Sequence, residues 1–167
     1  MTQTIATPIP TLIQSTARFS DCRQYRYTLH RIWDTSKPYC MFVGLNPSTA
    51  DEIQNDPTVR RCIGYAIDWN FGGLIMTNIF SFRATDPKDM KAHPEPVGPK
   101  NNYWLKKVSA DAGLTLCAWG NHGSHLDRAT QVIPLLTNPH CLKVTGAGHP
   151  SHPLYLKKDL QPIPFSV

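Results

Sequence analysis

The sequence predicts a single α/β domain, a three-layer α/β/α sandwich around a mostly parallel central sheet. Apolar runs of strand length alternate with segments of helical periodicity, a pattern typical of parallel strands joined by right-handed crossovers. Polar clusters directly follow several of the strand-like runs. In open α/β sheets, this carboxyl edge of the strands is where ligands bind. A chain of 167 residues with 41% hydrophobic content suits one packed domain.

The first two predicted strands precede the first polar cluster. Residues 23–33 alternate aromatic and polar side chains, with Tyr25 and Tyr27 on one face, which predicts a half-buried strand. Residues 39–45 are almost continuously apolar and predict a central strand covered on both faces. Because only a short turn separates the two, we expect them to form an antiparallel hairpin.

The most clearly marked element is a helix over residues 57–67. Asp56 supplies an N-cap and Pro57 a proline at the first helical position, and apolar residues recur at helical spacing behind them. Gly72 and Gly73 follow, which indicates that the helix has ended before them. The alternation then continues with strands at 74–80, 114–119 and 141–144, a short helix after Asp86-Pro87, and helices at 101–112 and 126–136, the last interrupted by Pro134.

The chain divides into an arm and one domain. Residues 1–20, rich in Thr and Pro, predict a flexible N-terminal arm, and residues 21–167 predict a single α/β domain. No apolar run approaches the roughly 20 residues that span a bilayer, and the start lacks the basic-then-apolar plan of a signal peptide. We therefore expect a cytoplasmic protein with no membrane partner, and a monomer.

Charge permits a polyanionic partner without requiring one. The formal net charge is +5 and the pI about 9.0, which suits contacts to phosphates. The basic residues are dispersed, with pairs at Arg60-Arg61, Lys106-Lys107 and Lys157-Lys158. DNA, double- or single-stranded, and a free nucleotide are both compatible with this pattern.

Cysteines and histidines give little support to a metal centre. The five cysteines contain no Cys-x-x-Cys pair, and most lie in apolar stretches, where a free thiol behaves as a small core residue. His-x-x-His occurs twice, at His122/His125 and His149/His152, which keeps a metal site open as an alternative. Since no carboxylate or Cys stands at ligand spacing, we predict neither a metal nor another cofactor.

Three polar residues stand where catalysis or base recognition would need them. Asn46, between Leu45 and Pro47, places an amide at a strand end. Asn78 lies inside an apolar strand, where a buried amide needs partners and where it could read the edge of a nucleobase. His149, in a glycine-rich loop, could donate to an oxygen that becomes negative in a transition state. A turn residue, a core amide and a surface histidine are the structural alternatives.

In order along the chain, these motifs resemble those of the uracil-DNA glycosylase superfamily. Gly44-Leu45-Asn46-Pro47-Ser48 is similar to the first catalytic motif in its Asn-bearing form, residues 74–80 to the base-reading strand, and His149-Pro150-Ser151 to the last motif. At closer range the chain from Tyr25 to Phe165 resembles the uncharacterised family called domain of unknown function 1643. The resemblance implies a uracil-DNA glycosylase-like fold.

The resemblance also implies roles for individual residues. Asn46 would hold the attacking water and His149 would stabilise the leaving base, while Asn78, with Leu45 near it, would bind the base. Arg83 has no counterpart in the motifs; it follows a strand at the expected pocket edge, where it could contact a base carbonyl or a phosphate, or form a surface salt bridge. Ser48 and Ser151 would contact phosphates, and Leu154 would fill the space left by a flipped nucleotide. Two departures stand out, because His152 separates Ser151 from Pro153 and the first motif lacks the Asp and Tyr of uracil-specific enzymes.

From these features we expect a hydrolase that flips out a modified or damaged DNA base and cleaves its N-glycosidic bond, as in DNA repair. Two alternatives stay open: a hydrolase or transferase acting on free nucleotides or nucleosides, and a binding module without catalysis. The identity of the base is not indicated by the sequence.

Overall fold

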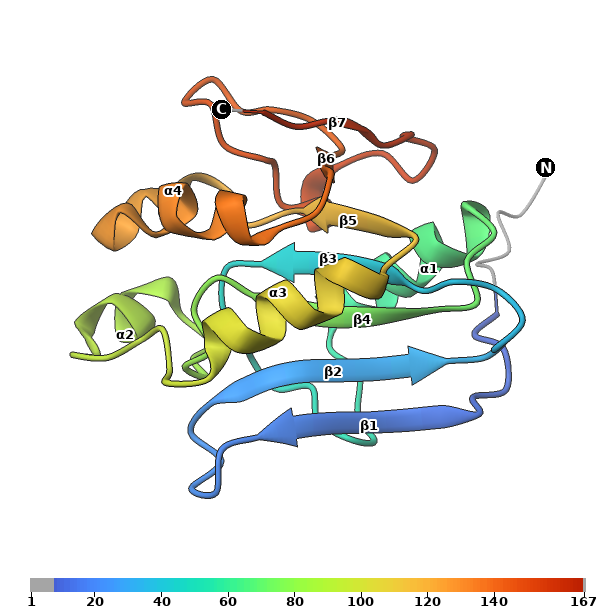
Figure 1. The fold of residues 1–167 in the computed structure, drawn as a ribbon, viewed down its shortest axis with the longest axis horizontal. Helices are drawn as coiled ribbons and strands as arrows, with labels where there is room; N and C mark the ends of the chain where they lie inside the picture. The colour runs from blue at the N-terminus through green and yellow to red at the C-terminus, as the bar shows by residue number, and fades with distance from the viewer. Residues whose placement is uncertain (1–7, 167) are drawn as a thin grey trace, which may run out of the picture.

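The computed structural model describes residues 8–166 and has one sheet of seven strands with helices on both sides (Figure 1). The strand order is β1-β2-β4-β3-β5-β6-β7. The strands are β1 (Gln14–Phe19), β2 (Arg26–Ile32), β3 (Cys40–Gly44), β4 (Gly73–Asn78), β5 (Leu114–Cys117), β6 (Pro139–Cys141) and β7 (Ile163–Pro164). The α-helices are α1 (Pro57–Asp68), α2 (Pro87–Ala92), α3 (Asn101–Asp111) and α4 (Arg128–Val132).

The prediction of a mostly parallel sheet is wrong, because the sheet is mixed. Strands β4, β3, β5 and β6 run parallel, whereas β1, β2 and β7 are antiparallel to their neighbours. The antiparallel strands lie toward the two edges. The edge strands carry no long apolar run, since β1 alternates exposed and half-buried positions and β7 has two residues, both exposed. Strand β1 occupies the second half of the predicted N-terminal arm, whose residues 1–7 lie outside the described part.

The predicted hairpin between the first two central elements is also wrong. Strand β4 is inserted between β2 and β3, antiparallel to the first and parallel to the second. All six residues of β4 are buried, so the most apolar strand takes a position covered by neighbours on both sides. The connection from β2 to β3 crosses the start of β4, where Gly72 donates to Pro38 and accepts from Trp33.

Two apolar clusters, one on each face of the sheet, hold the layers together. Cys40 and Phe42 of β3 pack with α1 on one face, and Met41 and Val43 pack with α3 and α4 on the other. This alternation follows from the two-residue period of a strand. In Figure 1, α3 lies in front of the sheet and α1 behind it.

Helices α1 and α3 agree closely with their predicted ranges, while the region before β6 does not form one helix. Asp56 caps α1 by accepting from the backbone N of Val59 at 2.9 Å, and Pro57 is its first residue. The predicted helix 126–136 is divided into 3-10 segments around α4, because Leu126 and Asp127 have positive φ and Pro134 follows. The predicted strand 141–144 is instead β6, which ends at Cys141.

Candidate functional site

A cavity of about 670 Å³ lies at the carboxyl ends of β3 and β4, on the α1 side of the sheet. Phe42 and Met76 give it an apolar base, and the backbone after each central strand contributes polar groups at the rim. This is the edge at which the sequence analysis expects a ligand. Its polar lining includes Arg26, Asn46, Ser48, Asp56, Asn78, His122 and His152.

Asn46 is held in place through both hydrogens of its side-chain amide. Nδ2 donates to the carbonyl oxygen of Ala84 at 2.7 Å and to that of Pro47 at 3.1 Å. Within residues 8–166, no group donates to Oδ1. The strand-end amide therefore has one polar atom left for a ligand or a water, and this atom is an acceptor.

Asn78 has an amide nitrogen with no partner, although the residue is 4% exposed and lines the cavity. A buried donor without an acceptor costs free energy, so native proteins seldom retain one without a ligand, water or functional reason. Gly44 lies beside it on β3, and a Cβ atom at that position would come within 2.8 Å of Asn78 Oδ1. Glycine at 44 thus leaves the space that the amide occupies.

Two buried side chains from the α3 side fix the end of β4. Asn101 donates through Nδ2 to the backbone oxygens of Asn78 and Ile79, at 2.9 and 3.0 Å. Arg128 donates to the same Ile79 oxygen at 2.7 Å and to Asn102 Oδ1 at 2.6 Å. These bonds satisfy backbone carbonyls beyond the sheet ladder and hold the strand that carries Asn78.

Arg26 places a cation in the cavity wall. Its side chain is 2% exposed and makes one hydrogen bond, from Nη1 to the Ala50 oxygen at 2.9 Å, while its Nε has no partner. Burial lowers the pKa of Arg26 to about 10, with the nearby Asp56 carboxylate opposing the shift. The guanidinium is therefore still charged at neutral pH.

His152 contributes a neutral imidazole to the lining of the same cavity. Its Nδ1 accepts a hydrogen bond from the backbone N of Leu154 at 3.3 Å, so in the neutral ring the proton is carried by Nε2. Burial lowers the pKa of His152, and the negative charge of Asp56 acts against this shift. The ring can thus donate a hydrogen bond to a ligand without carrying a full charge.

Five of the residues assigned from the sequence line this cavity: Leu45, Asn46, Ser48, Asn78 and Leu154. Arg83, His149 and Ser151 are not among its lining residues. Arg83 turns toward the β1–β2 connection, where it donates to the Arg23 oxygen at 3.1 Å and stacks over Phe19.

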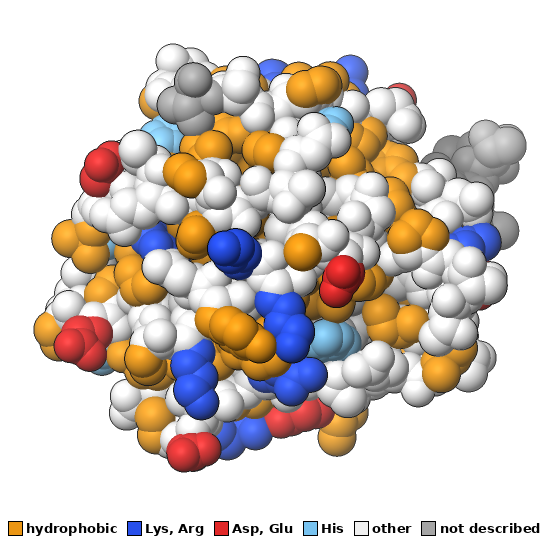
Figure 2. Space-filling model, in the orientation of Figure 1, with side chains coloured by type: hydrophobic (Ala, Val, Ile, Leu, Met, Phe, Trp, Pro, Cys, Tyr) orange, Lys and Arg blue, Asp and Glu red, His pale blue; other side chains and the backbone are white. Residues whose placement is uncertain are grey.

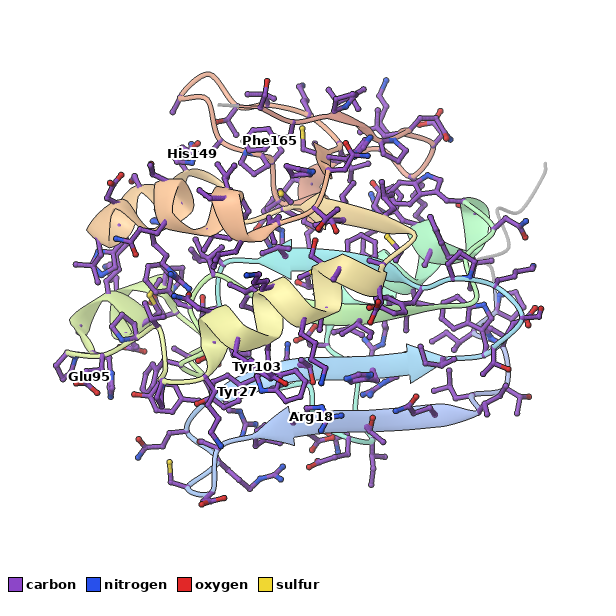
Figure 3. All side chains as sticks on the ribbon, viewed as in Figure 1. Arg18, Tyr27, Glu95, Tyr103, His149 and Phe165 are labelled. Atoms are coloured by element: carbon purple, nitrogen blue, oxygen red, sulfur yellow. The ribbon has the colours of Figure 1, made fainter. Side chains whose placement is uncertain are left out.

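The loop that carries His149 does not reach the cavity, because a tight turn closes before it. The backbone N of Thr145 donates to the His149 oxygen, and Gly148 has a φ of 87°, which closes a tight turn there. Figure 3 labels His149 near the outer edge of the molecule, above α4 in that view. The same chain reaches the cavity three residues later, at His152.

The sequence analysis missed Arg26 and Tyr155 and read Asp56 only as a helix cap. Arg26 carries little signal in the sequence, because its strand also contains the polar residues Thr28, His30 and Arg31. Tyr155, at 89% exposure on the cavity rim, carries no periodic signal because it lies in a short 3-10 turn. The sequence analysis named His152 only as part of a His-x-x-His pair and as a departure from a motif.

Basic side chains lie on both sides of the sheet. Lys106 and Lys107 belong to α3, and Figure 2 shows Lys and Arg side chains gathered over that face, away from the α1 side. Lys107 and Arg18 lie over the aromatic rings of this face, with Arg18 Cζ 4.5 Å from the centroid of Trp104. On the α1 side, Arg60, Arg61, Lys158 and Leu154 line a second groove of about 440 Å³.

The described part of the chain contains no cluster of three or more His, Cys, Asp or Glu residues able to hold a metal ion. Cys40, Cys62, Cys117 and Cys141 are buried free thiols, and Cys22 is an exposed one. Between residues 8 and 166 there is no helix with the length and apolar character to cross a membrane.

Comparison with known proteins finds a family and no individual relative. The model of a family described as "Protein of unknown function (DUF1643)" matches residues 26–154. No curated protein and no solved structure gives a significant match. The match includes Arg26 at one end and Leu154 at the other, and so spans most of the cavity wall.

Proposed function

The chain belongs to the DUF1643 family, whose description names no activity, and we propose from its cavity that it hydrolyses the N-glycosidic bond of a modified or damaged base in DNA. The observation that carries the proposal is the amide of Asn78. Its Nδ2 is a buried donor without a partner, in a cavity that also contains Asn46. An amide matches the paired donor and acceptor on a base edge, and a base flipped from a duplex needs such an enclosed polar pocket.

Asn46 and His152 divide the chemical step between them. Asn46 Oδ1 accepts a hydrogen bond from the attacking water and orients its oxygen toward the sugar carbon. His152 Nε2–H donates to the departing base, a role that the motif resemblance gives to His149. We assign it to His152 because that residue lines the cavity and its Nδ1 is already an acceptor for Leu154. Such preorganised donors act where charge develops.

The rim supports entry of a nucleotide from a strand. Ser48 and Leu154 line the cavity mouth, and the ring of Tyr155 is available to stack on a neighbouring base. Helices on both faces of four central parallel strands, with the site at their carboxyl ends, support the finer proposal of a uracil-DNA glycosylase-like sandwich. The antiparallel edge strands extend that arrangement.

A free nucleotide or nucleoside is the second candidate substrate. It is favoured by the position of Lys106 and Lys107 on α3, across the sheet from the cavity, where they are unable to contact a strand entering it. Arg60, Arg61 and Lys158 line the groove on the α1 side, and this local charge favours DNA as the first candidate.

The test is incubation with oligonucleotides that carry a panel of modified bases, followed by alkali, which cuts abasic sites. New strand breaks that disappear with Asn46→Ala and persist with Lys106→Met are the expected result. Base release from free nucleotides alone would replace the first candidate by the second. A footprint on the oligonucleotide without cleavage or base release would refute both hydrolase candidates and indicate a binding module.

A further inference from the structure

The two buried arginines of β2 differ in how fully their donors are used. Arg31 donates to Asn55 Oδ1 at 2.9 Å, and it also bonds the backbone oxygens of His30, Asp51 and Gln54. It ties the loop before α1 to the sheet. Arg26 is buried to a similar degree but bonds one backbone oxygen, that of Ala50. Arg31 is therefore explained by the fold, and Arg26 is not.

No carboxylate of residues 8–166 lies within 4.0 Å of the Arg26 guanidinium. Asp56 and Asp51 are the acidic groups whose charge reaches it, and Arg31 and Arg83 act against them. A buried cation without a paired anion is costly, and charged groups left in this state are typical of binding sites rather than of stable cores. An anion that enters the cavity would provide the negatively charged partner that Arg26 does not have.

Asn78 places a second unused donor in the same cavity. Arg26 and Asn78 belong to β2 and β4, which are neighbours in the sheet, and both line the wall. One supplies an N–H with positive charge and the other a neutral N–H, and neither has an acceptor. Both donors line one cavity, so a planar group that presents oxygen atoms there has two N–H groups to accept from.

We propose that Arg26, with Asn78, binds an oxygen-bearing edge of the ligand ring and neutralises the negative charge which that ring acquires. The inference rests on the proposed function. In the hydrolysis, the bond from the sugar carbon to the ring nitrogen breaks and both electrons stay with the base, so the base leaves as an anion with charge on its oxygens. Water supplies the new oxygen on the sugar carbon, and its proton passes to solvent or to the departed base. Arg26 is the cation that faces this anion.

The probes are three free six-membered rings. Barbiturate is an anion at neutral pH, and uracil is neutral and has ring oxygens at two of the same positions. Cytosine carries an amino group in place of one of the oxygens of uracil. Calorimetry on the intact protein is expected to rank them in that order, with barbiturate bound about tenfold more tightly than uracil. Arg26→Met abolishes the preference for barbiturate, and Arg26→Lys retains part of it. Lys106→Met removes the same charge from the exposed face of α3 and leaves the ranking unchanged.

The outcomes separate this inference from the proposed function. Equal binding of barbiturate and uracil, undiminished barbiturate binding by a folded Arg26→Met protein, or no binding of any ring overturns the role of Arg26. Arg26-dependent barbiturate binding by a protein that cleaves no oligonucleotide supports the anion site and refutes the glycosylase. Cleavage at the full rate by Arg26→Met supports the glycosylase and overturns the anion site.

Discussion

Arg26 and Arg31 lie five positions apart on one strand, and their contacts predict opposite effects on stability. Arg31→Met removes the hydrogen bonds to the Asn55 side chain and to the backbone oxygens of Asp51 and Gln54, and we expect it to lower the free energy of unfolding by about 3 kcal/mol or more. Arg26→Met removes a buried charge with one bond and is expected to change it by less than about 1 kcal/mol, with stabilisation the favoured sign. Urea unfolding of the two variants measures both.

A large loss of stability with Arg26→Met would contradict this account, because it would show that the fold itself depends on that cation. Arg26 would then be a structural residue like Arg31, and its place in the cavity wall would need no ligand.

Gly44 provides a second test at the level of a single residue. A Cβ atom there would lie 2.8 Å from Asn78 Oδ1, so Gly44→Ala must displace the amide that we propose reads the base. We expect about a tenfold loss of ring binding and a loss of about 1 kcal/mol in stability. Gly64→Ala on α1 is the matched control, since a Cβ there meets no atom within 4 Å. Equal binding by the two variants would exclude a role for the Asn78 amide.

Some site residues are visible in the sequence because their local context is unusual. Asn46 stands before a proline at a strand end, and Asn78 lies within an apolar run. Both residues line the cavity. The choice between His149 and His152 depends on where a turn closes, which is set by the hydrogen bond between Thr145 and His149 and by the positive φ of Gly148. The sequence alone does not show at which residue that turn closes.

At the level of elements, β2 carries a histidine that links stability to pH. Burial, with the charges of Arg18 and Arg31, lowers the pKa of His30 to about 4 in the folded protein. The unfolded chain binds the proton at the ordinary value near 6.5, so the native state is favoured above that pH and loses this advantage as pH falls toward 4. We expect the wild type to lose about 2 kcal/mol of stability between pH 7 and pH 4.5 through this group.

The measurement is the free energy of unfolding at both pH values for wild type and His30→Gln. The variant is expected to lose less stability on acidification, and His122→Gln, at an exposed position, to behave like the wild type. An identical acid dependence in wild type and His30→Gln would show that the burial of His30 has no energetic consequence.

Elements with strong local signals could be predicted, and those without them could not. Helix α1 is marked by Asp56, Pro57 and its apolar spacing, and its bounds agree with the prediction to within one residue. Strands β1 and β7 are marked by none of these, since β1 is half-exposed and β7 contains two residues. They exist because a neighbouring strand offers unpaired backbone groups, which is a property of the assembled sheet.

At the scale of the whole molecule, the sheet order brings together segments far apart in the sequence. Strand β4 enters between β2 and β3, so Arg26, Asn46 and Asn78 meet at one cavity although they come from different loops and strands. Alternating apolar runs predict an α/β fold, but pairing order is decided by which strands are buried on both sides. That is why the sequence predicts the parallel centre but predicts neither the insertion of β4 beside β2 nor the edge strands β1 and β7.

The central claim is that this cavity hydrolyses an N-glycosidic bond, with Asn46 acting in the transition state and Asn78 in binding. The direct measurement is single-turnover release of free base, together with affinity, for wild type, Asn46→Ala and Asn78→Ala on one modified oligonucleotide. We predict that Asn46→Ala lowers the rate about a hundredfold with affinity nearly unchanged, and that Asn78→Ala weakens binding and broadens base choice. Base release by Asn46→Ala at the wild-type rate, with Asn78→Ala unchanged in affinity, would contradict the account.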